Sequence, residues 1–188
     1  LGAARMTPEA LTAAPDLDAV VIAVPNHLHR RYAEAALHAG KHVFCEKPLA
    51  LTPSDAHALA EASRQAGRVL MVGHLTRHMP LYREIAGLLA EGRLGDLVAA
   101  SFHRMHSVRG RSWRMDPGMG GGAVFDLLIH DYDLMLWYMG KPSCVVARGI
   151  RNALGSYNYA AATFALPGGA VAVVEGGFVL RPPAGLTA

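Results

Sequence analysis

The sequence predicts an α/β fold with a parallel sheet, followed by an α+β domain with a mainly antiparallel sheet. Short apolar runs alternate with helical segments up to about residue 76, as strands joined by crossover helices do. After that point, two helices are followed by three strand-like runs, and the Pro-Gly-Gly segment at 167–169 is a typical hairpin turn. We therefore predict two domains, at 1–76 and 77–188.

Three apolar runs predict the strands of the first domain. Residues 19–24 (AVVIAV) are rich in β-branched side chains, which is typical of a strand buried on both faces. The next strands are expected at 42–45 and 69–72. Because short helical segments connect them, all three strands are expected to run parallel.

Capping residues predict the ends of the two helices between these strands. In the first helix, Asn26 is the predicted N-cap and Gly40 suits the C-terminal end. In the second, Thr52 is the predicted N-cap, Pro53 occupies the first helical position and Gly67 ends the helix.

The second domain has a different order of elements. Its predicted helices lie at 80–91 and 122–139, separated by a strand at 97–105 and a polar, glycine-rich loop at 107–122. Strands are then expected at 143–151, 157–166 and 170–180.

Composition excludes several classes of protein. With 52% hydrophobic and 18% charged residues, the 188-residue chain can bury a core. The net charge is only +3, and the sequence contains no run of five basic residues. We therefore expect no nucleic-acid partner. No apolar run is long enough to cross a bilayer, so no membrane partner is expected. Cys45 and Cys144 lie far apart, which favours a reducing compartment and a cytoplasmic protein.

Polar residues follow each strand of the predicted parallel sheet. Residues 25–29 (PNHLH) follow the first strand, Glu46-Lys47-Pro48 the second and residues 73–77 (GHLTR) the third. The carboxyl ends of parallel strands share one edge of a sheet, and ligands bind along that edge. Taken alone, a Glu-Lys-Pro tripeptide is more often a solvated turn.

The segment GGGAVFDLLIHDYDL at 120–134 contains a second candidate group. Asp126 and His130 are four residues apart and would share one face of a helix. An imidazole oriented by a carboxylate suits a general base, although a satisfied core histidine fits the same pattern. A metal site of Asp126, His130 and Asp133 is a third alternative. Three ligands on one helix without a further cluster make a weak site, so we assign no metal.

The ordered set of PNxxH, EKP and GGGxxxDxxxH resembles the Gfo/Idh/MocA family of NAD(P)-dependent oxidoreductases. The resemblance covers essentially the whole chain. It implies that 1–76 is the C-terminal half of a dinucleotide-binding Rossmann domain and that 77–188 is a truncated substrate and oligomerisation domain. The G-x-G-x-x-G turn of relatives has no counterpart before residue 19, so we expect a piece of a longer oxidoreductase. NAD or NADP is the implied cofactor, with the choice between them open.

The resemblance also implies roles for individual residues. His130 would take the hydroxyl proton, Asp126 would hold the imidazole, and Lys47 would bond the substrate oxygen. The Lys47–Pro48 bond is often cis in relatives. The implied contacts to the cofactor are Pro25, Asn26, His29, Glu46, Trp113 and Arg114.

The expected substrate is a sugar or cyclic polyol, and a homo-oligomer formed through the C-terminal sheet is expected. The sequence departs from relatives at Leu75, where an Asn is frequent. A sensor that binds dinucleotide or sugar without turnover, or an inert piece of the enzyme, are the alternatives. Four residues are plausible pocket donors but equally plausible solvated loop residues: His103, His106, Arg109 and Trp113.

Overall fold

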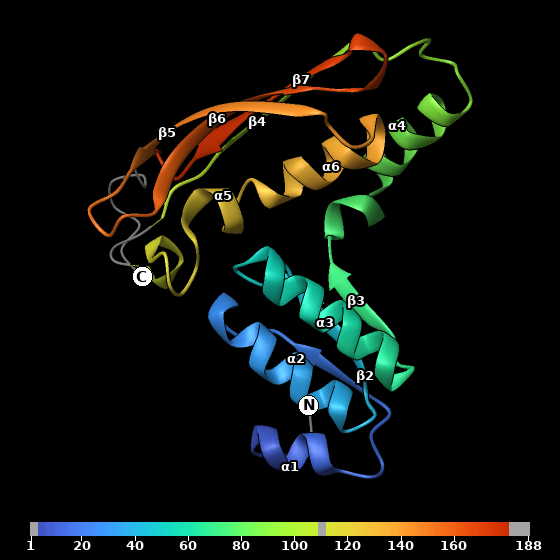
Figure 1. Ribbon diagram of the computed structural model, residues 1–188, viewed down its shortest axis with the longest axis vertical. Coiled ribbons are helices and arrows are strands. Elements are labelled where there is room, and N and C mark those ends of the chain that lie inside the picture. The colour runs from blue at the N-terminus through green and yellow to red at the C-terminus, as the bar shows by residue number, and fades with distance from the viewer. Residues whose placement is uncertain (1–3, 109–111, 181–188) are drawn as a thin grey trace. The chain divides into compact units, whose positions relative to one another are not determined.

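The computed structural model describes residues 4–108 and 112–180, and the chain divides into two compact units (Figure 1). The first unit is Leu1–Gly73 and the second is His74–Ala188. The first unit contains α1 (Pro8–Ala13), β1 (Ala19–Ile22), the 3₁₀ helix η1 (Asn26–Leu28), α2 (His29–His38), β2 (His42–Glu46), α3 (Pro53–Ala66) and β3 (Leu70–Gly73). The second contains η2 (Leu75–His78), α4 (Pro80–Ala90), β4 (Ala99–Met105), η3 (Trp113–Met115), α5 (Gly122–Asp126), α6 (Ile129–Met139), β5 (Cys144–Arg151), β6 (Tyr157–Ala165), η4 (Pro167–Gly169) and β7 (Val171–Gly177).

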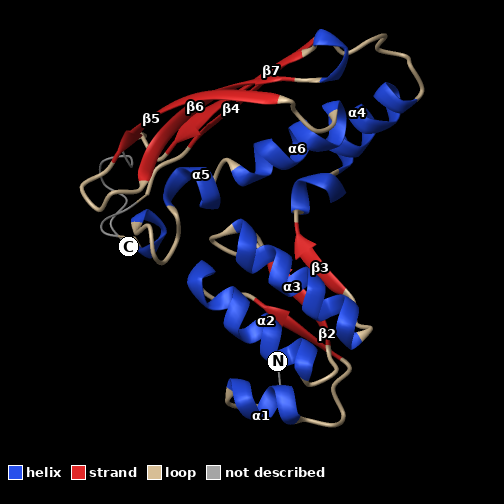
Figure 2. Cartoon of the chain, in the orientation of Figure 1, coloured by secondary structure: helices blue, strands red, loops and turns tan. Residues whose placement is uncertain are grey.

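The first unit has the predicted parallel sheet, in the order β1-β2-β3 (Figure 2). In register, Ile22 of β1 pairs with Cys45 of β2, and Cys45 pairs with Val72 of β3. Apolar side chains of the sheet pack against α2 and α3 in one core. Its buried members are Val20, Ile22, Ala33, Ala36, Leu37, Val43, Cys45, Leu59 and Ala62.

The prediction that residues 19–24 are buried on both faces is wrong. Val20 and Ile22 are buried, whereas Val21 is 72% exposed. In the described part of the chain, β1 pairs only with β2, and its two buried side chains face the core shared with α2 and α3. The apolar run therefore reads as a fully buried strand although only alternate residues are covered.

Three of the predicted helix ends are confirmed. The Thr52 hydroxyl accepts a hydrogen bond from the Asp55 backbone N–H at 3.1 Å and caps α3. Gly67 follows α3 with a φ of +63°, which glycine adopts without strain. Gly40 follows α2 in the same way, with a φ of +73°.

The predicted N-cap at Asn26 is wrong. Asn26 is the first residue of η1, which the Leu28 N–H closes by bonding to the Pro25 carbonyl at 2.9 Å. Helix α2 begins only at His29, and no side chain caps it. Pro25 is extended, and the tight turn of η1 begins directly after it. Asn26 is therefore already part of the 3₁₀ helix, whereas an N-cap would precede the helix.

The second unit has a mixed sheet in the order β4-β7-β6-β5. Strands β5, β6 and β7 form an antiparallel meander, and β4 joins β7 in parallel. The predicted hairpin turn is confirmed, because the Leu166 N–H bonds to the Ala170 carbonyl across η4 at 2.9 Å. Helices α5 and α6 lie along one face of this sheet (Figure 1). Their shared core is Leu128, Met135, Ala160, Ala162, Phe164, Leu166, Ala172 and Val174.

The single helix predicted at 122–139 is wrong, because the structure has two. Helix α5 ends at Asp126 and α6 begins at Ile129. Between them, the N–H groups of Leu127 and Leu128 both bond to the carbonyl of Ala123. Leu128 is fully buried in the core beneath the sheet, so tertiary packing explains a break that no glycine or proline signals.

Among the helices that the structure describes, none is long and apolar enough to cross a membrane.

Candidate active site

The Glu46-Lys47-Pro48 segment leaves the carboxyl end of β2 in the first unit. Glu46 is the last residue of the strand and pairs with Gly73 of β3. Both Glu46 and Lys47 are partly exposed, whereas Pro48 is buried. The Lys47–Pro48 bond is cis, as the resemblance implies. The loop therefore presents a cation and a carboxylate at the edge where parallel sheets bind ligands.

His29 joins the exits of β1 and β2. Its Nδ1 lies 2.7 Å from the Pro48 carbonyl, and its Nε2 lies 2.9 Å from the Val24 carbonyl. The side chain is 1% exposed, so these two backbone groups take up both ring nitrogens. In the structure, the imidazole of His29 thus ties the first motif, PNxxH, to the second, EKP.

The end of β3 lies close to the same carboxylate. A Cβ added at Gly73 would come within 3.2 Å of Glu46 Oε2 and of Phe44 Cζ. Glycine at this position lets the Glu46 side chain lie against the end of the neighbouring strand. The exits of β2 and β3 are therefore in contact.

Cys45, directly before this loop, carries no chemistry. The thiol is buried, and burial raises its pKa to about 12, with a smaller contribution from the charge of Glu46. The thiol stays neutral and is not a nucleophile at ordinary pH.

In the second unit, the three glycines at 120–122 allow η3 to lie against the start of α5. A Cβ at Gly120 would fall 2.3 Å from the Arg114 Cα atom and 2.6 Å from its carbonyl oxygen. A Cβ at Gly122 would fall 2.7 Å from the carbonyl oxygen of Tyr157, the first residue of β6. Larger side chains at these positions would separate η3, α5 and β6.

This close packing brings Arg114 to Asp126. The Arg114 Nε atom lies 3.5 Å from Asp126 Oδ2, and the Asp126 side chain is only 10% exposed. The guanidinium of Arg114 also lies over the ring of Trp113, 5.6 Å from its centroid. The predicted cofactor contacts Trp113 and Arg114 and the predicted catalytic Asp126 are thus brought together in the second unit.

His130 lies in the first turn of α6, one helix after Asp126. Lys47 belongs to the first unit, and Asp126 and His130 belong to the second. The orientation of His130 by Asp126 stays a prediction, as does the convergence of these three residues on one substrate.

Ser156 and Asn152, which the sequence did not indicate as site residues, hold the end of η3 at Met115. The Met115 carbonyl accepts hydrogen bonds from Ser156 Oγ at 2.6 Å and from Asn152 Nδ2 at 3.0 Å. Asn and Ser are typical of the turn between β5 and β6, but nothing in their spacing signals a bond to a loop some forty residues earlier.

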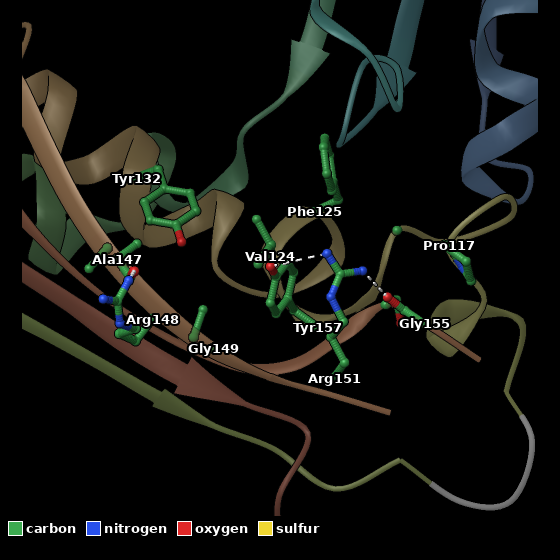
Figure 3. Close-up of a pocket in the computed structure, with 14 residues that line it drawn as sticks. Pro117, Val124, Phe125, Tyr132, Ala147, Arg148, Gly149, Arg151, Gly155 and Tyr157 are labelled. Atoms are coloured by element: carbon green, nitrogen blue, oxygen red, sulfur yellow. Dashed lines mark hydrogen bonds between the residues drawn. The ribbon is translucent and has the colours of Figure 1, made fainter. Parts of the chain in front are cut away.

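A separate cavity of about 550 Å³ lies in the second unit between α5 and strands β5 and β6 (Figure 3). Arg151 donates to the Gly155 carbonyl at 2.6 Å and to the Tyr157 hydroxyl at 3.2 Å, and it stacks on the Tyr157 ring. Its guanidinium is therefore already engaged. Asp126 and His130 are not among the lining residues, so the cavity is distinct from the candidate site.

The other expected pocket donors do not line this cavity either. His103 bonds to Glu175 through Nδ1 at 2.9 Å, and His106 Nδ1 donates to the Ser107 carbonyl at 2.7 Å. Arg109 lies outside the described residues.

The alternative metal site is not formed. Asp133 is bonded to Arg77 through both carboxylate oxygens. Within residues 4–108 and 112–180, no three His, Cys, Asp or Glu side chains gather as metal ligands.

Both halves of the chain match the same protein family. Residues 4–74 match an oxidoreductase family with an NAD-binding Rossmann fold, and residues 82–187 match the GFO/IDH/MocA C-terminal domain. The chain therefore belongs to the GFO/IDH/MocA oxidoreductase family, as its motifs indicate.

Individual relatives are consistent with this membership. The chain is 41% identical over 138 residues to 1,5-anhydro-D-fructose reductase of Ensifer adhaerens, covering 72% of this chain and 41% of that one. It is 36% identical over 132 residues to inositol 2-dehydrogenase of Pseudomonas syringae pv. syringae, covering 69% and 38%. The chain thus spans about two fifths of the length of these relatives.

Solved structures share the fold. A levoglucosan dehydrogenase in complex with NADH and levoglucosan superposes with a TM-score of 0.86 at 27% identity, over 92% of this chain and 50% of that one. An aldose-aldose oxidoreductase from Caulobacter crescentus, complexed with glycerol, superposes with a TM-score of 0.85 at 29% identity, over 92% and 54%.

Proposed function

We propose that this chain is part of an NAD(P)-dependent oxidoreductase that transfers a hydride between a nicotinamide cofactor and a hydroxyl or carbonyl group of a sugar or cyclic polyol. The observation that carries the proposal is the Lys47 loop, which His29 fixes at the ligand-binding edge of a parallel sheet. The activities for which the relatives are named, on anhydrofructose and inositol, support the substrate class.

The residues present fit the nicotinamide and ribose half of such a cofactor. Pro25 and Asn26 follow β1, Glu46 and Lys47 follow β2, and Gly73 keeps the end of β3 free of a side chain. We propose that Pro25, Asn26 and Glu46 contact the cofactor. His29 belongs to the same set, and its buried ring contributes by holding the two strand exits together.

The second unit would supply the acid–base residues and further contacts. Trp113 and Arg114 would lie against the cofactor, and Asp126, which pairs with Arg114, would hold the imidazole of His130. The first unit corresponds in this proposal to the C-terminal half of a dinucleotide-binding domain. The second corresponds to a substrate and oligomerisation domain.

The chemistry divides between these residues. The nicotinamide ring supplies or accepts the hydride when the cofactor is bound. His130 takes the proton of the substrate hydroxyl, and Asp126 stabilises the charged imidazole. Lys47 donates a hydrogen bond to the substrate oxygen and stabilises its developing negative charge.

Turnover by variants of the complete protein tests these roles. We expect Lys47→Ala and His130→Ala each to lower kcat/KM by about 10²–10⁴-fold with NADH or NADPH and a sugar ketone, followed by absorbance at 340 nm. Lys141→Ala and His38→Ala are the matched controls, because both side chains are exposed and lie outside the proposed site. Near-normal turnover in either site variant would refute its assignment, and dinucleotide binding without turnover in the wild type would favour a sensor.

We also propose a cytoplasmic homo-oligomer formed through the face of the second unit's sheet that α5 and α6 do not cover. Val146 and Ile150 of β5 are 66% and 65% exposed, and Val171 of β7 is 41% exposed. Apolar side chains in neighbouring strands support a protein interface. Light scattering checks the mass, and Val146→Lys with Ile150→Lys should reduce it to that of one chain.

A further inference from the structure

Helix α6 carries two buried carboxylates beside His130. Asp131 is 3% exposed and Asp133 is 8% exposed. A buried carboxylate is unfavourable unless it is paired and hydrogen-bonded. Both are paired, and each partner comes from a different element of the second unit.

Each partner is an arginine that bonds with two nitrogens. Arg104 of β4 reaches Asp131 with Nε at 2.6 Å and Nη2 at 2.8 Å. Arg77 of η2 reaches Asp133 with Nε and Nη2, both at 2.7 Å. Two parallel bonds fix the angle between the planar groups as well as their distance. In both cases the hydrogen bond to the carboxylate raises the pKa of the arginine, so each guanidinium stays charged.

The two pairs hold opposite sides of the helix. Successive residues of an α-helix are rotated by about 100°, so positions 131 and 133 point about 200° apart. One side is held to the sheet through β4, and the other is held to η2, the segment that opens the second unit. A helix held on opposite sides resists rotation about its own axis.

The contact with η2 has further support. Arg77 lies over the ring of Trp137, one turn along α6, with its guanidinium 5.6 Å from the centroid. His74 Nδ1 lies 3.6 Å from Asp133 Oδ2, the oxygen that accepts the bond from Arg77 Nε. The Arg77 side chain is thus placed by a carboxylate and by an aromatic face of one helix.

We propose that the pairs Arg77–Asp133 and Arg104–Asp131 are positioning residues, which set the rotation of α6 and thereby the place of His130. The proposal rests on the proposed function, in which His130 is the base. His130 is about 60° around the helix from Asp133. At a side-chain radius of about 5–6 Å, a rotation of 20° would move the imidazole by about 2 Å. Misplacement by about 1 Å can lower a rate about 10²-fold.

A purely stabilising role explains these pairs less well. Replacing a buried ion pair with apolar side chains of similar volume is often neutral or stabilising, so such pairs are weak stabilisers. Their geometric constraint is what an apolar contact would not supply.

The first test reads the imidazole directly and needs no turnover. In ¹⁵N-labelled chain, the ring signals of His130 are assigned by their loss in His130→Asn. We expect Arg77→Lys and Asp133→Asn to shift or double these signals while those of His103, on the other face of the sheet, stay in place. Arg93→Lys is the matched control, because Arg93 pairs with Glu91 and both side chains are exposed. Signals of His130 that coincide with wild type in both site variants would overturn the proposal.

Arg77→Lys keeps the positive charge and is expected to remain folded, which far-UV circular dichroism checks. The second test uses the complete protein. We expect Arg77→Lys to lower kcat about 10–100-fold with the KM for the dinucleotide unchanged. An unchanged kcat, or an equal loss in Arg93→Lys, would count against positioning. If the wild type shows no turnover, the proposed function fails, and the imidazole signals alone decide whether the pairs set the place of His130.

Discussion

Replacing Gly120 with alanine tests whether the glycine segment holds η3 against α5. The new Cβ would fall 2.3 Å from the Arg114 Cα atom and 2.6 Å from its carbonyl oxygen. Carbon atoms pack at about 3.5–4 Å, so the backbone must separate by more than about 1 Å. Both colliding atoms are backbone, so no side-chain rotation relieves the clash.

Gly118 in the same loop is the matched control. Among the described residues, the atom nearest to a Cβ there is Asp116 Oδ1, at 3.4 Å, which is an ordinary contact. Alanine reduces the freedom of the unfolded chain equally at both positions, which stabilises by about 0.4–1 kcal/mol where the conformation allows it. Overpacking opposes this gain at Gly120 by about 1–3 kcal/mol. The free energies of unfolding of the two variants should therefore differ by about 1–3 kcal/mol.

Tryptophan fluorescence in urea measures this difference and reports on the unfolding of the second structural unit. The chain has two tryptophans, Trp113 and Trp137, and both belong to the second unit. A difference of 1 kcal/mol corresponds to about 4 °C in Tm for a domain of about 100 residues. If Gly120→Ala unfolds within about 0.5 kcal/mol of Gly118→Ala, the close approach of η3 to α5 is not what the glycine serves.

Three further predictions concern stability. Because the pKa of buried Cys45 is raised to about 12, the unfolded chain loses this proton first, and the unfolding free energy of the first unit should fall by about 1 kcal/mol per pH unit above pH 9. Far-UV circular dichroism in urea at pH 8 and 10 checks this, and Cys45→Ala should remove the slope. Asp131→Asn should destabilise the second unit by about 3 kcal/mol in urea because it leaves Arg104 without its charged partner, whereas Glu91→Gln at an exposed pair should change little. Thr52→Ala should lower the stability of the first unit by about 1 kcal/mol through loss of the α3 cap, and Thr52→Ser should restore most of it in the same assay.

Local signals predicted much of the fold. Thr52, Gly67 and Gly40 end their helices as expected, because caps depend on residues close in sequence. The break between α5 and α6 was not predictable in this way. Leu127 and Leu128 continue a helical pattern, and only packing beneath the sheet explains why the helix stops.

The candidate site was predictable as a set of residue types and less so as a geometry. The motif order predicts Lys47, Asp126 and His130 as site residues, and their roles stay a prediction. It did not reveal that His29 would bond to the Pro48 carbonyl, because that contact depends on how two strand exits meet. Nor did it reveal Arg77 and Arg104 as partners of α6, since both come from segments more than twenty residues earlier.

The parallel pairing of β4 with β7 constrains the order in which the second unit can fold. Ala99 pairs with Val171, and among the described strands β4 pairs with β7 alone, so this pairing must wait until the meander of β5, β6 and β7 has been synthesised. The meander can form through local contacts, whereas β4 must close a long loop that contains α5 and α6. During synthesis, β4 therefore emerges from the ribosome before β7, the strand with which it pairs, and its pairing closes the loop that contains the helix held through Arg104.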